Sequence, residues 1–310
     1  MFETNPDPKI DETELYITFS KKLENDVNFL DGLNNLVGCY GRIKIFHSKS
    51  GPIILNTELI DSAVRTLNSI KLCCSIGSFS DANTLIRKYR DDLLLYVYSL
   101  DVINNRKNFI EGDLLNLNTA NVDEFRNTFM DLRLNPKYTD DEMVLEAWLN
   151  NKVNDLPGKL KFRISFENYM DRFKQNPDIT GILSNYGLAN YWEELRNKLN
   201  DYVHNNGLNY ACHNNTRLLD KNLKTLLDNV NTRVSYITTF FLILIIMTDA
   251  TLISSTDMID HLDMGITPPE GAQYWIASFI QEYIDEKVIP LHPELKAYLK
   301  DKNAYRMDIN

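Results

Sequence analysis

The residues best suited to chemistry lie on one predicted helix, residues 191–204, which ends at His204. On a helix, Arg196, Asn200 and His204 are spaced four apart and form one polar stripe. An imidazole can act as a general acid or base near neutral pH, and a nearby cation can stabilise a phosphate. The alternative is a solvated helix end, where His204 interacts favourably with the helix dipole and the following Asn-Asn-Gly caps the last turn.

The end of this helix resembles the signature helix of HEPN-like proteins. The resemblance rests on residues 199–204, Leu-Asn-Asp-Tyr-Val-His, which end an amphipathic helix and precede Asn-Asn-Gly. HEPN-like proteins are α-helical bundles, and many are metal-independent ribonucleases of toxin–antitoxin and phage-defence systems. The resemblance therefore implies a helical bundle that cleaves RNA without a metal or cofactor, with His204 as general base. Such nucleases usually build their site across a dimer, so it also implies a homo-oligomer.

The sequence departs from the family's motif at the position of the cation. That motif is an Arg, usually followed by a polar residue, and then a His after a gap of four to six residues. If Asn200 takes the polar position, Leu199 stands where the family has Arg. Lys198 meets the spacing but lacks the planar fork that grips phosphate, and Arg196 is too distant in sequence. The site residues that the resemblance implies are His204, Asn200, Asp201, Lys198 and Arg196.

A second helix, predicted over residues 81–100, carries Arg87 and Arg90. If this helix packs against the one that ends at His204, either arginine can supply the cation that the motif lacks. The alternative is a solvated charged face, because Arg87 and Asp91 are spaced for an ordinary ion pair on a helix surface.

A third candidate is the acidic stretch near residue 260. Asp257, Asp260 and His261 can hold a divalent ion, although no second helix offers a partner with recognisable ligand spacing. The alternative is a helix end that leads into a Pro-containing loop, residues 265–271, which with Tyr274 behind it can form a packed turn or a docking surface. The sequence contains no phosphate-binding loop, dinucleotide fingerprint, hydrolase elbow or zinc-ribbon spacing. Kinase, dehydrogenase and serine hydrolase functions are therefore set aside, and no cofactor is expected.

Composition narrows the class of protein. The 310 residues are 44% hydrophobic and 25% charged, which is typical of a globular chain. A net charge of −10 argues against broad nucleic-acid binding and restricts RNA to a local site. Four cysteines without paired spacing and a polar N-terminus without a signal segment predict a cytoplasmic protein. The apolar run 236–247 is too short to span a bilayer and predicts a buried core helix, so no membrane is expected.

Hydrophobic periodicity predicts an all-α, multi-helix bundle with one small β-hairpin near residues 40–55. The helices are expected at 12–36, 63–77, 81–100, 122–132, 139–154, 165–173, 180–186, 191–204, 216–228, 234–253 and 273–284. Ser78, followed by Asp81, is expected to cap the third of these. We expect an N-terminal helical region, 1–120, and a C-terminal bundle, 121–310, unless the chain is a single domain.

Three function hypotheses follow from these residues. The first is a HEPN-like ribonuclease of a defence or toxin–antitoxin system that acts on RNA at a local site. The second is a non-catalytic helical module that binds a protein partner, which the Leu199 register and the acidic charge favour. The third is a metal-dependent enzyme that uses the acidic stretch near residue 260.

Overall fold

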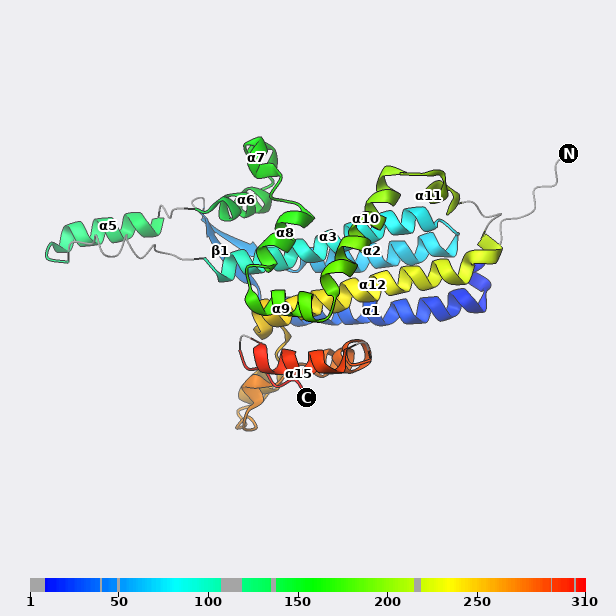
Figure 1. Cartoon of the computed structure of the whole chain (residues 1–310). Coiled ribbons are helices and arrows are strands. Elements are labelled where there is room, and N and C mark those ends of the chain that lie inside the picture. The colour runs from blue at the N-terminus through cyan, green and yellow to red at the C-terminus, as the bar shows by residue number, and fades with distance from the viewer. Residues whose placement is uncertain are drawn as a thin grey trace.

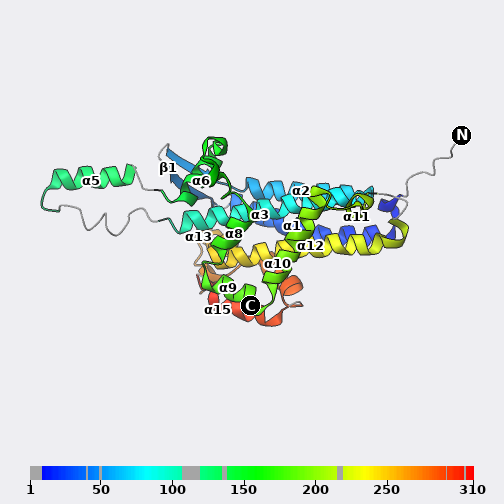
Figure 2. The same cartoon turned by 45° about the horizontal axis from the view of Figure 1, so that its top comes forward.

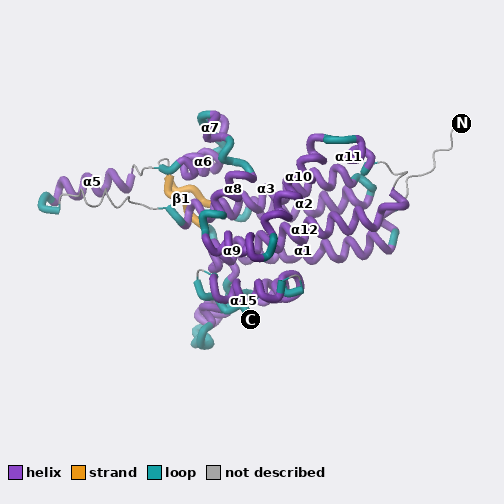
Figure 3. The backbone as a smooth tube through the Cα atoms, in the orientation of Figure 1, coloured by secondary structure: helices purple, strands orange, loops and turns teal. Residues whose placement is uncertain are grey.

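The computed structural model describes residues 9–39, 41–48, 51–106, 119–134, 138–214, 219–290, 292–303 and 305–310. In these ranges the protein is mostly helical, with one two-stranded sheet (Figures 1 and 3). The prediction of an all-α bundle with one small hairpin is therefore confirmed. The N-terminal tail up to residue 8 and the expected helix start at Thr216 lie outside the described residues.

Four long helices run side by side and form the body of the molecule (Figures 1 and 2). They are α1 (Glu14–Cys39), α2 (Glu58–Ser75), α3 (Phe79–Asn104) and α12 (Leu219–Asp249). α2 and α3 form an antiparallel hairpin, and Ser62 donates a hydrogen bond of 2.9 Å to Asp92 across the pair. Gly77 lies in the turn with a φ of 77°, a left-handed conformation that glycine adopts without steric cost.

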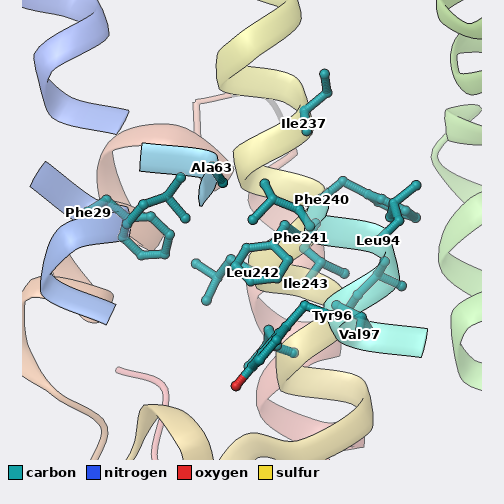
Figure 4. Close-up of a cluster of buried hydrophobic side chains, with 14 of the residues drawn as sticks. Phe29, Ala63, Leu94, Tyr96, Val97, Ile237, Phe240, Phe241, Leu242 and Ile243 are labelled. Carbon is teal, nitrogen blue, oxygen red and sulfur yellow. The ribbon is translucent and has the colours of Figure 1, made fainter. Parts of the chain in front are cut away.

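The core lies where α12 meets α1 and α3. Every side chain from residue 237 to residue 247 on α12 is buried, and Figure 4 shows Phe240 and Phe241 beside Leu94 and Tyr96 of α3. Full burial of one such side chain contributes about 1.5–3 kcal/mol. The predicted core helix is thus confirmed.

Among the described residues, one segment, 222–253, is long and apolar enough to cross a membrane. Its most apolar window is 83% buried inside the bundle. Neighbouring helices therefore cover the side chains that a membrane span would turn toward lipid.

The hairpin joins β1 (Lys44–Ser48) to β2 (Gly51–Leu55) in antiparallel register, with Phe46 opposite Ile53. Phe46 is fully buried, and the Arg106 guanidinium lies 4.4 Å from the centre of its ring.

Shorter helices follow α3 along the chain, and α6, α8 and α10 pack against it. They are α5 (Val122–Leu134), α6 (Asp140–Leu149), η2 (Val153–Asp155), α7 (Gly158–Lys161), α8 (Phe166–Phe173), α9 (Pro177–Asn185), α10 (Leu188–His204) and α11 (Leu208–Cys212). α6 begins with a capping box in which Thr139 accepts from the amide of Glu142 at 3.2 Å and Glu142 accepts from the amide of Thr139 at 2.7 Å. Both views place α5 apart from the bundle.

Three expected elements differ in the structure. α12 is one continuous helix where two were expected, because no Gly or Pro interrupts residues 229–233 and Val230, Arg233 and Val234 are buried there. Ser78 does not cap α3: its hydroxyl donates to the Asp81 carboxylate rather than accepting from a backbone amide.

The third difference lies in the C-terminal region, where one helix was expected over 273–284. The chain instead forms η4 (Ala250–Ile253), α13 (Asp257–Asp263), η5 (Ala272–Tyr274), α14 (Ser278–Tyr283), the π-helix η6 (Ile284–Val288) and α15 (Pro293–Lys302). Trp275 and Ile276 pair their backbones with Asp308 and Ser254 in isolated bridges, which holds them extended and ends the expected helix.

Buried side chains from residues 1–120 and from 121–310 belong to one hydrophobic cluster. The Tyr89 hydroxyl of α3 lies 2.6 Å from the Thr238 hydroxyl of α12, deep in this shared core. The two ranges are thus joined by common packing as well as by the chain.

Candidate functional site

Helix α10 ends at His204, where the sequence places its end. Asn205 follows in the left-handed conformation, with a φ of 48°, and its amide bonds back to the last turn. The helix lies on α3 and contacts α9 and α11. It buries Leu195, Leu199 and Tyr202 and leaves His204 exposed.

The structure does not bring the expected cations to His204. Arg196 forms an ion pair with Glu167 of α8 and precedes His204 by eight positions, about 12 Å along the helix axis. Lys198 is exposed and lies about 9 Å along the axis from His204. Among the residues that the structure describes, none donates to or accepts a hydrogen bond from the His204 imidazole.

Asp201 stabilises the end of α10 through hydrogen bonds to residues that follow the helix. Its carboxylate accepts hydrogen bonds from Asn206 at 3.0 Å and from the Tyr210 hydroxyl of α11 at 2.8 Å. These two bonds lower the pKa of Asp201 below its ordinary value. Asp201 therefore ties α11 to α10 as an ionised acceptor. Its neighbour Asn200 is half-buried on the same helix.

Leu199, at the register of the family's arginine, has no exposed surface. It belongs to the hydrophobic core rather than to the polar stripe. A cation at this position would point into the interior.

Helix α3 packs against α10, as a supply of the missing cation by Arg87 or Arg90 requires, yet both arginines interact with other residues. Arg90 is only 1% exposed, donates to Asp91 at 2.7 and 2.9 Å, and lies 4.2 Å from the centre of the Phe166 ring. Arg87 lies 3.7 Å from the same Asp91 carboxylate. Neither arginine supplies the missing cation in this arrangement.

A different histidine and arginine, His213 and Arg233, both contact Tyr202 near this end of α10. The Tyr202 hydroxyl lies 2.9 Å from Nδ1 of His213, and the Arg233 guanidinium lies 5.6 Å from the centre of the Tyr202 ring. Burial, and then the charge of Arg233, lowers the pKa of His213 and so favours its neutral imidazole. Arg233 is 7% exposed and donates to Asn83 of α3, so it is not open to a phosphate.

Sequence reasoning missed this cluster. The available signal was Arg233 itself, a charged residue beside an apolar run, where a buried arginine needs a partner. The partner Asn83 is 150 residues away and becomes a neighbour only through the packing of α3 on α12.

The acidic stretch near residue 260 forms α13, and its side chains bond locally. Asp257 accepts from Ser255, and Asp260 accepts from Thr256 at 2.9 Å. His261 Nδ1 lies 2.7 Å from the backbone oxygen of Asp257. Across the described ranges, no three His, Cys, Asp or Glu side chains gather as metal ligands would.

The same region exposes a set of large apolar side chains, which we call the α13 patch. α13 and the loop after it project from the bundle below α15 in the view of Figure 1. The members of the patch are 36–64% exposed and consist of Met258, Ile259, Leu262, Met264, Ile266 and Tyr274. Residues 257–275 also contain four acids and no Lys or Arg.

Comparisons with protein-family models, with curated proteins and with solved structures return no significant match for this chain.

Proposed function

We propose that the protein is a non-catalytic helical interaction module that binds a basic, amphipathic segment of a protein partner on the α13 patch. The observation that carries this proposal is the exposed apolar surface on α13 beside acids and without a basic residue. Apolar surface of this kind marks interaction sites in soluble proteins.

The state of α10 supports the same proposal. Arg196 pairs with Glu167, Asp201 holds α11, and Leu199 fills the core, so these residues stabilise the bundle. A HEPN-like ribonuclease, with its site completed across a homo-oligomer, is the competing hypothesis. The four unpaired cysteines support a cytoplasmic location for the module.

Charge complementarity selects the kind of partner. Asp257, Asp260, Asp263 and Glu270 are exposed beside the patch, and a basic segment would meet them with opposite charge. A second copy of this chain would bring acids against acids at a two-fold interface, which is unfavourable.

The partner prediction can be tested with two designed helical peptides, one of Leu and Lys and one of Leu and Glu in the same pattern. We expect the Leu/Lys peptide to bind the wild type in calorimetry. The variant Ile259→Ser/Leu262→Ser, which keeps every charge, is expected to lose at least about tenfold in affinity because the apolar anchors are gone.

A matched control is Leu72→Ser, which removes an exposed leucine from α2, far along the chain from the patch, and should bind as the wild type does. Equal binding of both peptides, an unchanged affinity in the double variant, or dimerisation through α13 in sedimentation would each contradict the proposal.

The ribonuclease hypothesis predicts something different for His204. We expect purified wild type and His204→Ala to leave total RNA equally intact at neutral pH, with and without EDTA, because Arg196 and Lys198 lie about 12 and 9 Å along the helix axis from His204. His261→Ala serves as a control for loss of a surface imidazole. RNA cleavage that persists in EDTA and disappears only in His204→Ala would instead establish the nuclease.

A further inference from the structure

A cavity of about 710 Å³ lies between the bundle and the C-terminal helices. Its walls come from α1, α12, the start of α10, the π-helix η6 and α15. None of the residues of the α13 patch or of the His204 end of α10 lines it. The cavity therefore belongs to neither site described above.

Asp26 of α1 lines this cavity and is only 1% exposed. Its carboxylate accepts a hydrogen bond of 2.6 Å from the Tyr283 hydroxyl of α14. Burial raises the pKa of Asp26, against the Lys287 charge and the Tyr283 hydrogen bond, which lower it. A buried carboxyl with a perturbed pKa that lines a cavity is typical of a ligand-binding group.

Asn231 of α12 adds a second acceptor. Asn231 lines the cavity, and its side-chain oxygen is buried and makes no hydrogen bond with the described residues. Leaving a buried acceptor without a hydrogen bond is unfavourable, and a donor from a ligand would relieve that penalty.

Another part of the lining is aromatic and apolar. Tyr186, Tyr191, Tyr236 and Phe240 belong to it, and the rings of Tyr191 and Tyr236 have centroids 3.9 Å apart. Phe240 and its neighbour Ile243 project from α12 in Figure 4. Aromatic faces attract cations, and the aliphatic members accept an apolar body.

The π-helix η6 brings charged residues to the cavity. A π-helix is rare and occurs frequently at functional sites, because its wider turn displaces side chains from the α-helical register. Glu286, Lys287 and Val288 of η6 all line the cavity. Lys287 is half-buried and makes no ion pair within 4.0 Å among the described residues.

We propose that this cavity binds a small amphipathic organic cation, an ammonium head on an apolar body, with the head at Asp26 and Asn231. The buried oxygens of Asn231 and Thr239 in the lining have no hydrogen-bond partner among the described residues, and both can accept a hydrogen bond. The three acids of the lining, Asp26, Asp228 and Glu286, outnumber its two lysines, Lys22 and Lys287. Asp228, Glu286 and Lys22 are exposed, so Asp26 is the one buried charged group of the described lining. This site stands independently of the proposed function.

The probes are n-octylamine, 1-octanol and octanoate, which share one chain length and differ in the head group. We expect calorimetry of the full chain at pH 7.5 to show octylamine binding at least about tenfold more tightly than octanol, and octanoate more weakly still. Asp26→Asn keeps an acceptor for Tyr283 while removing the charge, and should weaken octylamine at least about tenfold. Ser235→Trp, which fills the cavity from its lining, should abolish binding of all three.

Asp31→Asn is the matched control, because it removes an exposed carboxylate from the same helix outside the cavity. It should bind octylamine as the wild type does, and circular dichroism confirms that each variant is folded. The proposal is overturned by tightest binding of octanoate, by equal binding of octanol and octylamine, by equal effects of the Asp26 and Asp31 variants, by survival of binding in Ser235→Trp, or by no binding of any probe.

Discussion

A Leu199→Arg variant is expected to lose at least about 4 kcal/mol of folding free energy, enough to unfold much of a typical domain. The substitution restores the arginine of the HEPN motif in its register. Leu199 has no exposed surface, so the guanidinium would enter the core without a partner. An unpaired buried charge and an over-packed core are both strongly destabilising. Urea denaturation followed by circular dichroism measures the loss.

The control for this variant is Lys198→Arg, one residue earlier on the exposed face. It introduces the same side chain and should change the free energy of unfolding by less than about 0.5 kcal/mol. If Leu199→Arg were as stable as the wild type, the register would accept a cation and the ribonuclease hypothesis would gain support.

Arg172→Ala is expected to destabilise the protein by about 2–4 kcal/mol. Arg172 of α8 joins Asp101 at the end of α3 to Asp141 of α6, the latter at 2.7 Å, and all three side chains are mostly buried. Removing the arginine leaves two carboxylates close together without their shared cation. Thermal and urea unfolding both report the change.

Arg163→Ala is the matched comparison, since Arg163 also bonds Asp141 at 2.7 Å but is 35% exposed. We expect it to cost about 1 kcal/mol or less. Similar losses in both variants would contradict the view that burial determines the strength of this network.

The same network predicts a pH dependence. Burial raises the pKa of Asp141, but hydrogen bonds from Arg163, Tyr98 and Arg172 outweigh it and hold the pKa below its ordinary value. A carboxyl with a lowered folded-state pKa contributes stability above its unfolded pKa, near 4, and loses that contribution as the pH falls through the folded value. The stability gap between wild type and Arg172→Ala should therefore be full at pH 6 and shrink below about pH 4.

Much of the fold was predictable because it depends on local patterns. The apolar spacing along α2 and the separate start of α3 near residue 81 follow from periodicity. The helix expected from residue 139 is also present as α6, and its start is local because Thr139 and Glu142 bond each other's backbone amides. Where local signals were misleading, as in the unbroken α12, tertiary burial of Val230 and Val234 decided the outcome.

The candidate sites were less predictable. Asp26 had a sequence signal, since it stands on the apolar stripe of α1 with Leu23 and Leu30, yet its meaning depends on Tyr283, 257 residues away. Arg233 likewise stands out in the sequence beside an apolar run, but its partner Asn83 lies 150 residues away.

By itself, the sequence determined that this chain is a helical bundle, where most helices lie, and that α10 ends at His204 with an Asn cap. Helix formation and capping depend on residues a few positions apart, so spacing suffices. Only the tertiary structure decided that Arg196 pairs with Glu167, that Leu199 faces the core, and that Asp26 lines a cavity. Those facts depend on which helix faces meet, and the free energy that selects them comes from burial shared across the whole bundle.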